Sequence, residues 1–209
     1  MARYISAEDC PQRSDLWFQK KLGKFSGSDF HIFLGSSQTR EDALWEKVAE
    51  RMFKDSDKDN FVSQAMERGI ILEAEARRVY QAVTETKVTE VGLVEEDGEY
   101  DGWAVCSPDG LVGDDGIIEI KVPLTKNFLK WTDCVEGGER KLTYIRPEYE
   151  TQINFNLFVC DRKWCDFVYY SPRGGIVITR YYRNDEKIAK IKEALDRGIT
   201  FIKEKLMEI

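Results

Sequence analysis

The spacing of apolar residues along the chain predicts a mixture of helices and strands. Apolar positions recur every three or four residues over about 61–84 and again over about 184–207, which is typical of amphipathic helices. Between these helices, apolar and polar residues alternate in short runs separated by Asp-Gly turns. The expected strands in this region are 88–94, 103–106, 111–112 and 117–121. The pattern therefore predicts an α/β fold with an antiparallel meander in the middle of the chain.

Shorter elements complete this expectation. Gly23 is a typical helix stop, and Thr39 with Asp42 resembles a capping box at the start of a helix. The remaining expected elements are helices at about 12–22, 31–34, 40–53, 124–133 and 147–159, and strands at 167–171 and 175–182. No internal repeat or domain boundary is evident, so we expect one domain spanning residues 1–209.

Composition narrows the class of protein. A chain of 209 residues with 42% hydrophobic content can bury one full core. It contains no run of about 18 apolar residues, and its first ten residues do not resemble a secretion signal, so we expect no membrane association. Five cysteines without a CxxC pair indicate reduced thiols. These observations predict a cytoplasmic protein.

The net charge of −7 argues against a simple nucleic-acid binder, because phosphate binding needs a concentrated positive field. A nuclease is a different case. It needs clustered carboxylates to hold metal ions, and those ions reverse the sign of the local field. The acidity therefore disfavours a non-catalytic DNA-binding protein more than it disfavours a nuclease.

The candidate chemistry lies in Ser107-Pro108-Asp109-Gly110 and the following Glu119-Ile120-Lys121. Side chains alternate along a strand, so Glu119 and Lys121 are expected on one side and Ile120 on the other. A turn between the two motifs folds the chain back and brings Asp109 close to Glu119. Two carboxylates and a backbone carbonyl form an oxygen site suited to magnesium, and a lysine with a lowered pKa can position or deprotonate water there. An ordinary hairpin with solvated charges also fits this motif alone.

Three further blocks occur in order with this motif. They are Trp17-Phe-Gln-Lys-Lys21-Leu-Gly23 with Ser26-Gly-Ser28, Arg68-Gly69-Ile-Ile-Leu-Glu73, and Tyr149-Glu-Thr-Gln152. Together the four blocks resemble the PD-(D/E)XK nuclease superfamily and, more closely, the bacteriophage lambda exonuclease family of YqaJ-like viral recombinases. The resemblance covers about residues 17–172 and implies a restriction-endonuclease-like fold, a mixed twisted sheet flanked by helices.

The resemblance also implies roles for individual residues. Asp109, Glu119 and the Ile120 carbonyl match metal ligands, and Lys121 matches the catalytic lysine. Glu73 matches a glutamate near a second metal, and Gln152 a residue that steadies the lysine or the water. The positions implied to hold the 5′ phosphate or other parts of the DNA are Lys21, Ser28, Ser107, Lys126, Met66, Trp17 and Tyr149.

Two of these matches have alternatives. The family usually has arginine where this chain has Lys21, and lysine lacks the bidentate fork that grips a phosphate. Arg13 or Lys20 are candidates to compensate. Met66 occupies the position of an apolar wedge between the DNA strands, but it also suits an ordinary core residue.

By the resemblance we expect a magnesium-dependent 5′ to 3′ exonuclease, with two Mg²⁺ ions per site and Mn²⁺ as a substitute. It would digest one strand of linear double-stranded DNA to 5′ mononucleotides and leave a 3′ overhang for phage-type recombination. The family further implies a homotrimer, a single-strand annealing recombinase as partner, and a phage or prophage gene expressed in a bacterial cytoplasm.

Two other functions fit the sequence. A restriction-like endonuclease or nickase uses the same carboxylates and lysine, and a catalytically silent acidic protein, such as a DNA mimic or packing protein, carries them only as surface charge. Other chemistry has less support. Cys160 and Cys165 lack the spacing of a metal cluster, and His31, the only histidine, lies among apolar residues.

Overall fold

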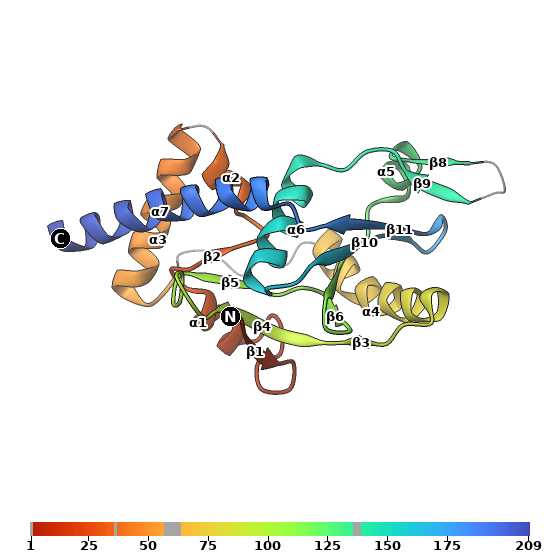
Figure 1. Cartoon of the computed structure of the whole chain (residues 1–209), viewed down its shortest axis with the longest axis horizontal. Helices are drawn as coiled ribbons and strands as arrows, with labels where there is room; N and C mark the ends of the chain where they lie inside the picture. Colours follow the sequence, from red (N-terminus) through yellow and green to blue (C-terminus); the bar gives the residue numbers. More distant parts are fainter. Residues whose placement is uncertain (1, 36, 57–63, 136–138) are drawn as a thin grey trace.

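The chain forms two larger sheets and a short hairpin with helices packed around them (Figure 1). The computed structural model describes residues 2–35, 37–56, 64–135 and 139–209, with only the backbone at residues 37 and 64–66. The helices are α1 (Asp15–Lys21), α2 (His31–Leu34), α3 (Ser37–Phe53), α4 (Gln64–Thr84), α5 (Thr125–Lys130), α6 (Pro147–Val159) and α7 (Asp185–Glu208). The strands are β1 (Ala2–Ser6), β2 (Phe25–Ser26), β3 (Val88–Thr89), β4 (Val91–Glu96), β5 (Ala104–Cys106), β6 (Gly110–Val112), β7 (Gly116–Lys121), β8 (Thr132–Cys134), β9 (Arg140–Leu142), β10 (Trp164–Ser171) and β11 (Gly175–Tyr182).

The first sheet has the strand order β1-β4-β5-β2. β4 pairs with β1 and β5 in antiparallel orientation, whereas the two-residue β2 joins β5 in parallel. Every residue of β4 is buried, including Glu95 and Glu96. Their carboxylates are satisfied locally: Lys24 Nζ lies 2.9 Å from Glu95, and the Tyr100 N–H donates to Glu96 over 2.7 Å. Buried charge is thus tolerated in this sheet because each carboxylate has a partner.

The second sheet has the order β11-β10-β7-β6-β3, with β7 in the middle. β7 and β10 are parallel, and the other neighbours are antiparallel. The chain passes from the first sheet to the second between β5 and β6, so residues 107–109 link the two sheets. These parallel and antiparallel pairings confirm the predicted mixed α/β fold.

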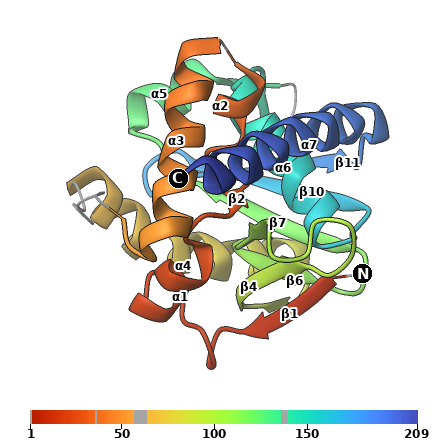
Figure 2. The ribbon, with the colours of Figure 1, turned by 90° about the vertical axis from the view of Figure 1, so that its left-hand side faces the viewer.

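Helices pack around the sheets (Figure 2), and one of three hydrophobic clusters contains residues of both sheets and of several helices. α7 packs against α3 and α6, and α6 is buried from Ile153 to its last residue. Gly198, which weakens α7 as an isolated helix, lies where a Cβ would come within 2.7 Å of Phe25 Cζ. The glycine therefore allows α7 to approach β2 closely. Among the described residues, no helix is both long and apolar enough to cross a membrane.

Several predicted boundaries were wrong. α1 begins at Asp15, because the Ser14 hydroxyl caps it by accepting the Trp17 N–H. α3 begins at Ser37 and contains Thr39, so Thr39 and Asp42 do not form a capping box at its start. The expected meander is divided: β4 pairs with β5 and β6 with β7, but β5 and β6 lie in different sheets. The strands that the pattern missed are β1, β2, β8 and β9.

Candidate active site

The segment that links the two sheets carries Asp109, and two bonds fix it against β7. Its N–H donates to the Ile118 carbonyl over 3.1 Å. Its carboxylate Oδ2 accepts the Ile120 N–H over 2.6 Å. Asp109 therefore lies beside the middle of β7 with its position set by that strand's backbone.

β7 places Glu119 and Lys121 on one side, as its alternation predicts. Lys121 Nζ lies 2.7 Å from Glu119 Oε1, and the Glu119 side chain is almost fully buried. Burial alone would lower the pKa of Lys121, because it disfavours the charged form. The negative charges of Glu119 and Asp109 have the larger effect, and the lysine pKa is raised. The sequence had suggested a lowered pKa. The difference arises because these two acidic side chains surround the ammonium group.

Helix α6 completes this network with two amides. Gln152 Oε1 accepts from Lys121 Nζ over 3.0 Å, so Gln152 contacts the lysine that it was expected to steady. Asn156 Nδ2 donates to the second oxygen of Glu119 over 3.2 Å, a contact that the sequence analysis missed. The spacing could have revealed it, because residues four apart on a helix share a face. A Cβ on Gly27 would come within 2.3 Å of Asn156 Oδ1, so this glycine gives the amide its space.

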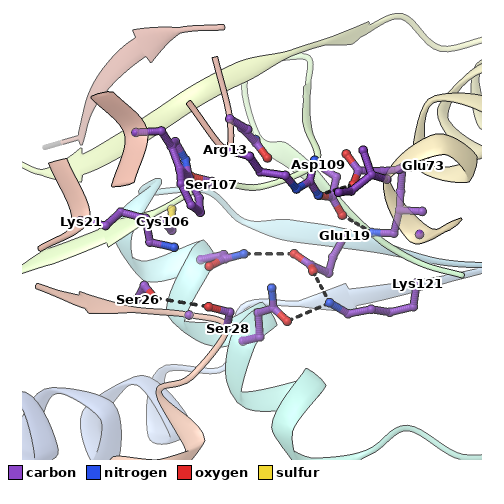
Figure 3. A pocket seen from close by; sticks show the side chains of 18 of the residues that line it. Arg13, Lys21, Ser26, Ser28, Glu73, Cys106, Ser107, Asp109, Glu119 and Lys121 are labelled. Carbon is purple, nitrogen blue, oxygen red and sulfur yellow. Dashed lines mark hydrogen bonds and ion pairs between the residues drawn. The ribbon is translucent and has the colours of Figure 1, made fainter. Parts of the chain in front are cut away.

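These residues line one end of a cavity of about 340 Å³, and a second group lines the other end (Figure 3). The second group comprises Trp17, Lys21, Ser26, Ser28 and Ser107. Ser26 was not among the predicted site residues, although it belongs to the same small-residue block. Its hydroxyl lies 3.3 Å from that of Ser28 and donates to Asp29 over 2.9 Å. The cavity therefore joins an acidic end to an end rich in hydroxyl groups and one lysine.

Lys21 is the cation at the second end. Its ammonium group lies 4.0 Å from the centre of the Trp17 ring. Burial lowers the pKa of Lys21 from 10.5 to about 8, and the charge of Asp29 only partly opposes this effect. The Trp17 indole N–H donates to Ser107 Oγ over 2.7 Å, which ties α1 to the segment before Asp109. This arrangement presents an ammonium group and hydroxyls toward the cavity.

Glu73 of α4 reaches the acidic end between two arginines. Arg77 Nη2 lies 3.0 Å from Glu73 Oε1, and Arg13 Nη2 lies 2.9 Å from Glu73 Oε2. Arg77 also donates to the Asp109 carbonyl over 2.9 Å. The structure thus brings the predicted Glu73 to the site and adds two cations that the sequence did not assign there.

Two predicted DNA-binding residues, Tyr149 and Lys126, do not line the cavity. Tyr149 does not line the cavity, but its ring centre is 5.0 Å from Lys121 Nζ. Lys126 is exposed on α5 and is not among the lining residues, and neither is Lys20, which was a candidate to compensate for Lys21. Met66 belongs to α4, but its side chain falls outside the described part of the chain, so the choice between wedge and core stays open.

The acidic end has the chemistry of a divalent-cation site. Burial and then the charges of Glu119 and Glu73 raise the pKa of Asp109 well above its ordinary value. A cation relieves such repulsion, and two carboxylates with the Ile120 carbonyl suit magnesium, which takes its other ligands from water and substrate. The described residues form no cluster of three or more His, Cys, Asp or Glu side chains with metal-ligand geometry. The fit therefore rests on two carboxylates and one backbone carbonyl.

A comparison with protein families places this site in context. The model of the YqaJ-like viral recombinase domain matches residues 16–163, which include both ends of the cavity. The chain belongs to this family. The match confirms the resemblance that the four sequence blocks indicated.

Comparison with solved structures also finds exonucleases of similar fold. The chain is similar to an alkaline exonuclease, LHK-Exo, from Laribacter hongkongensis, with 31% identity, a TM-score of 0.79 and coverage of 93% of this chain and 95% of that one. LHK-Exo in complex with dAMP gives a TM-score of 0.80. A phage-related exonuclease from Haemophilus somnus, 13% identical, shares the fold with a TM-score of 0.65 over 88% of this chain and 96% of that one. A search of curated proteins finds no match. The predicted restriction-endonuclease-like fold is confirmed.

Proposed function

We propose that this chain is a magnesium-dependent exonuclease that digests one strand of linear double-stranded DNA from its 5′ end. The family and the likeness to an alkaline exonuclease indicate a nuclease. The observation that carries the finer proposal is the two-ended cavity, in which the acidic network faces Lys21 and the serine hydroxyls. One end suits hydrolysis of a phosphodiester, and the other suits a terminal phosphate.

The residues at the acidic end have separate roles in metal binding and in positioning the attacking water. Asp109, Glu119 and the Ile120 carbonyl hold magnesium, for which Mn²⁺ substitutes, and Glu73 lies where a second ion is expected. Bound cations lower the pKa of the attacking water and neutralise charge on the leaving oxygen. Lys121, held by Glu119 and Gln152, orients that water by hydrogen bonding. Asn156 fixes the second oxygen of Glu119 and so limits how its carboxylate rotates.

The opposite end selects the 5′ terminus. Lys21, Ser28 and Ser107 bind the terminal phosphate, since an ammonium group and hydroxyls are good phosphate donors. The complex of LHK-Exo with dAMP supports a 5′ mononucleotide as the product here. Trp17, Tyr149, Lys126 and Met66 are proposed to contact other parts of the DNA, with Met66 as the wedge at the duplex end.

The biological setting follows from the family. The product is a duplex with a 3′ overhang, the substrate for a single-strand annealing recombinase encoded by the same phage or prophage. We propose a homotrimer acting in the bacterial cytoplasm. A ring around DNA would reconcile the net charge of −7 with its substrate, because basic residues can line the inside of an acidic assembly.

Digestion of matched DNA molecules tests this function. Linear duplexes with 5′-phosphate or 5′-hydroxyl ends are compared with covalently closed circles, in Mg²⁺, Mn²⁺ and EDTA. We expect metal-dependent release of mononucleotides from the phosphorylated linear DNA, and none from Asp109→Ala or Lys121→Ala. Cleavage of the circles would instead favour an endonuclease or nickase. Unchanged digestion by both variants would exclude the proposed centre, and a wild-type protein without activity on DNA would favour a silent acidic protein.

A further inference from the structure

Arg13 has an unusual backbone conformation directly beside the cavity. It is the third residue of a turn closed by the Ser14 N–H, which donates to the Pro11 carbonyl over 3.1 Å. Its φ is +68°, in the left-handed region that glycine adopts without penalty and other residues adopt with strain. An arginine here is unfavourable unless its side chain compensates for the backbone.

The turn is anchored so that this side chain has a defined direction. The Gln12 amide donates to the Val91 carbonyl over 2.9 Å and to the Pro108 carbonyl over 3.2 Å. The turn is therefore held on both β4 and the segment that precedes Asp109. From there the Arg13 side chain lines the cavity and points to Glu73 (Figure 3).

Arg77, the other partner of Glu73, differs from Arg13 in burial and in its contacts. The Arg77 side chain is 11% exposed and binds Glu73, Glu90 and the Asp109 carbonyl. The Arg13 side chain is 43% exposed, and within the described part of the chain its recorded partner is Glu73 alone. The donors of Arg77 are thus used in contacts within the fold. Most of the five N–H donors of Arg13, in contrast, can bind another acceptor.

Stability does not explain this arginine. The ion pair of Arg13 with Glu73 contributes little to the free energy of unfolding, because Arg13 is largely exposed. It therefore offsets at most part of the backbone strain of a non-glycine residue in the left-handed region. Strain of this kind persists at sites where it positions a functional group. Arg13 therefore needs a role that appears only when substrate is present.

We propose that Arg13 is a phosphate-contact residue that moves from Glu73 to a backbone phosphate of the DNA strand in the cavity. The inference rests on the proposed function, because it assigns this residue to the same DNA site. A guanidinium group matches two oxygens of a phosphate, which the single ammonium group of Lys21 cannot do. Glu73 Oε2 holds the Arg13 guanidinium group beside the reaction centre until a DNA phosphate replaces it as the acceptor. That oxygen is then free to bind a cation, while Arg77 still holds Oε1.

Salt-dependent DNA binding tests the inference. A fluorescent 5′-phosphorylated duplex is titrated in Ca²⁺ instead of Mg²⁺, with the probe checked for integrity. Each phosphate contact contributes about 0.9 to the slope of log affinity against log salt concentration. We expect Arg13→Gly to reduce the slope by about 1 and the affinity roughly tenfold. Arg13→Lys keeps the charge and should restore the slope while leaving the affinity reduced.

Two controls separate contact from structure. Arg197→Ala removes an equal charge from an arginine that is 61% exposed on α7 and does not line the cavity, and it should leave the slope unchanged. Arg13→Gly relieves the strained turn, so its Tm should equal or exceed that of the wild type. A wild-type slope in Arg13→Gly overturns the proposal, and a lowered Tm beside that slope identifies Arg13 as a structural tether. If the wild-type protein neither binds nor digests DNA, the proposed function itself fails.

Discussion

Replacing Lys21 with methionine should stabilise the protein at neutral pH. The fall of the Lys21 pKa from 10.5 to about 8 corresponds to about 3 kcal/mol of unfavourable charge burial. Methionine has a similar length and carries no charge. It loses the interaction with the Trp17 ring 4.0 Å away, which is worth about 1 kcal/mol. The expected net gain in the free energy of unfolding is therefore about 2 kcal/mol at pH 7.

The gain should disappear in alkaline solution. Because the folded pKa lies below the unfolded one, the unfolded chain binds more protons between about pH 8 and pH 10.5. The unfavourable free energy of burying the charged lysine is fully present below about pH 8. It decreases as the pH rises from about 8 to 10.5. Urea denaturation of the wild type and of Lys21→Met at pH 7 and pH 10 measures the difference. An equal difference at both pH values would refute the assignment of the cost to a buried charge.

The same residue should make end selection depend on pH. Lys21 loses its proton as the pH rises past about 8, so the preference for 5′-phosphorylated over 5′-hydroxyl duplexes should weaken there. Lys21→Arg is the matched control, because arginine stays charged over this pH range and still donates to phosphate. We expect this variant to keep its preference at pH 9, measured as the ratio of initial digestion rates. A preference that weakens equally in both proteins would assign the effect to another group.

Three further predictions concern packing around the site. Asn156→Ala should raise the magnesium concentration for half-maximal digestion about tenfold or more, because the amide fixes Glu119; a loss of stability without this shift would contradict the role. Gly110→Ala should cost about 1–3 kcal/mol in urea denaturation, since its Cβ would lie 2.2 Å from Val88 Cγ1. Gly69→Ala should gain up to about 1 kcal/mol, because among the described residues no atom beyond its own helical turn lies within 4 Å of the added Cβ. Asp166→Ala should cost about 2 kcal/mol by leaving Arg180 and the Tyr80 hydroxyl without their acceptor, with digestion per folded molecule unchanged.

The sequence predicted those parts of the site that depend on local geometry. Alternation along one strand was enough to place Glu119 and Lys121 together, and the family resemblance indicated Gln152 on the facing helix. Asn156 lies four residues after Gln152, so the spacing places it on the same helix face. Its contact with Glu119 follows only once α6 is placed against β7. Arg13 was a candidate beside Lys21, but its contact with Glu73 was not indicated, because its left-handed turn is one in which sequence patterns favour glycine.

The fold was predictable to a similar extent. The long periodic helices α4 and α7, and the shorter helix α6, were predicted at nearly their observed bounds. β2 has only two residues and therefore no measurable alternation, yet its pairing with β5 determines the position of the small-residue block. Assignment of β5 and β6 to separate sheets depends on distant partners, including the parallel pairing of β7 with β10. Pairing between strands far apart in sequence leaves no local pattern from which it can be inferred.

The passage of the chain between two sheets at residues 107–109 has a consequence for the length of the product. At the terminal-phosphate end, Lys21 lies on α1 and Ser28 just after β2 of the first sheet, while β7 of the second sheet carries Glu119 and Lys121, with Asp109 in the linking segment beside it. In the proposed reaction, the separation of the two sheets thus fixes the distance between the terminal phosphate of the strand and the bond that is cut. The number of nucleotides removed in each step is therefore set by the fold and not by the base sequence, and it is the same whichever base is at the terminus.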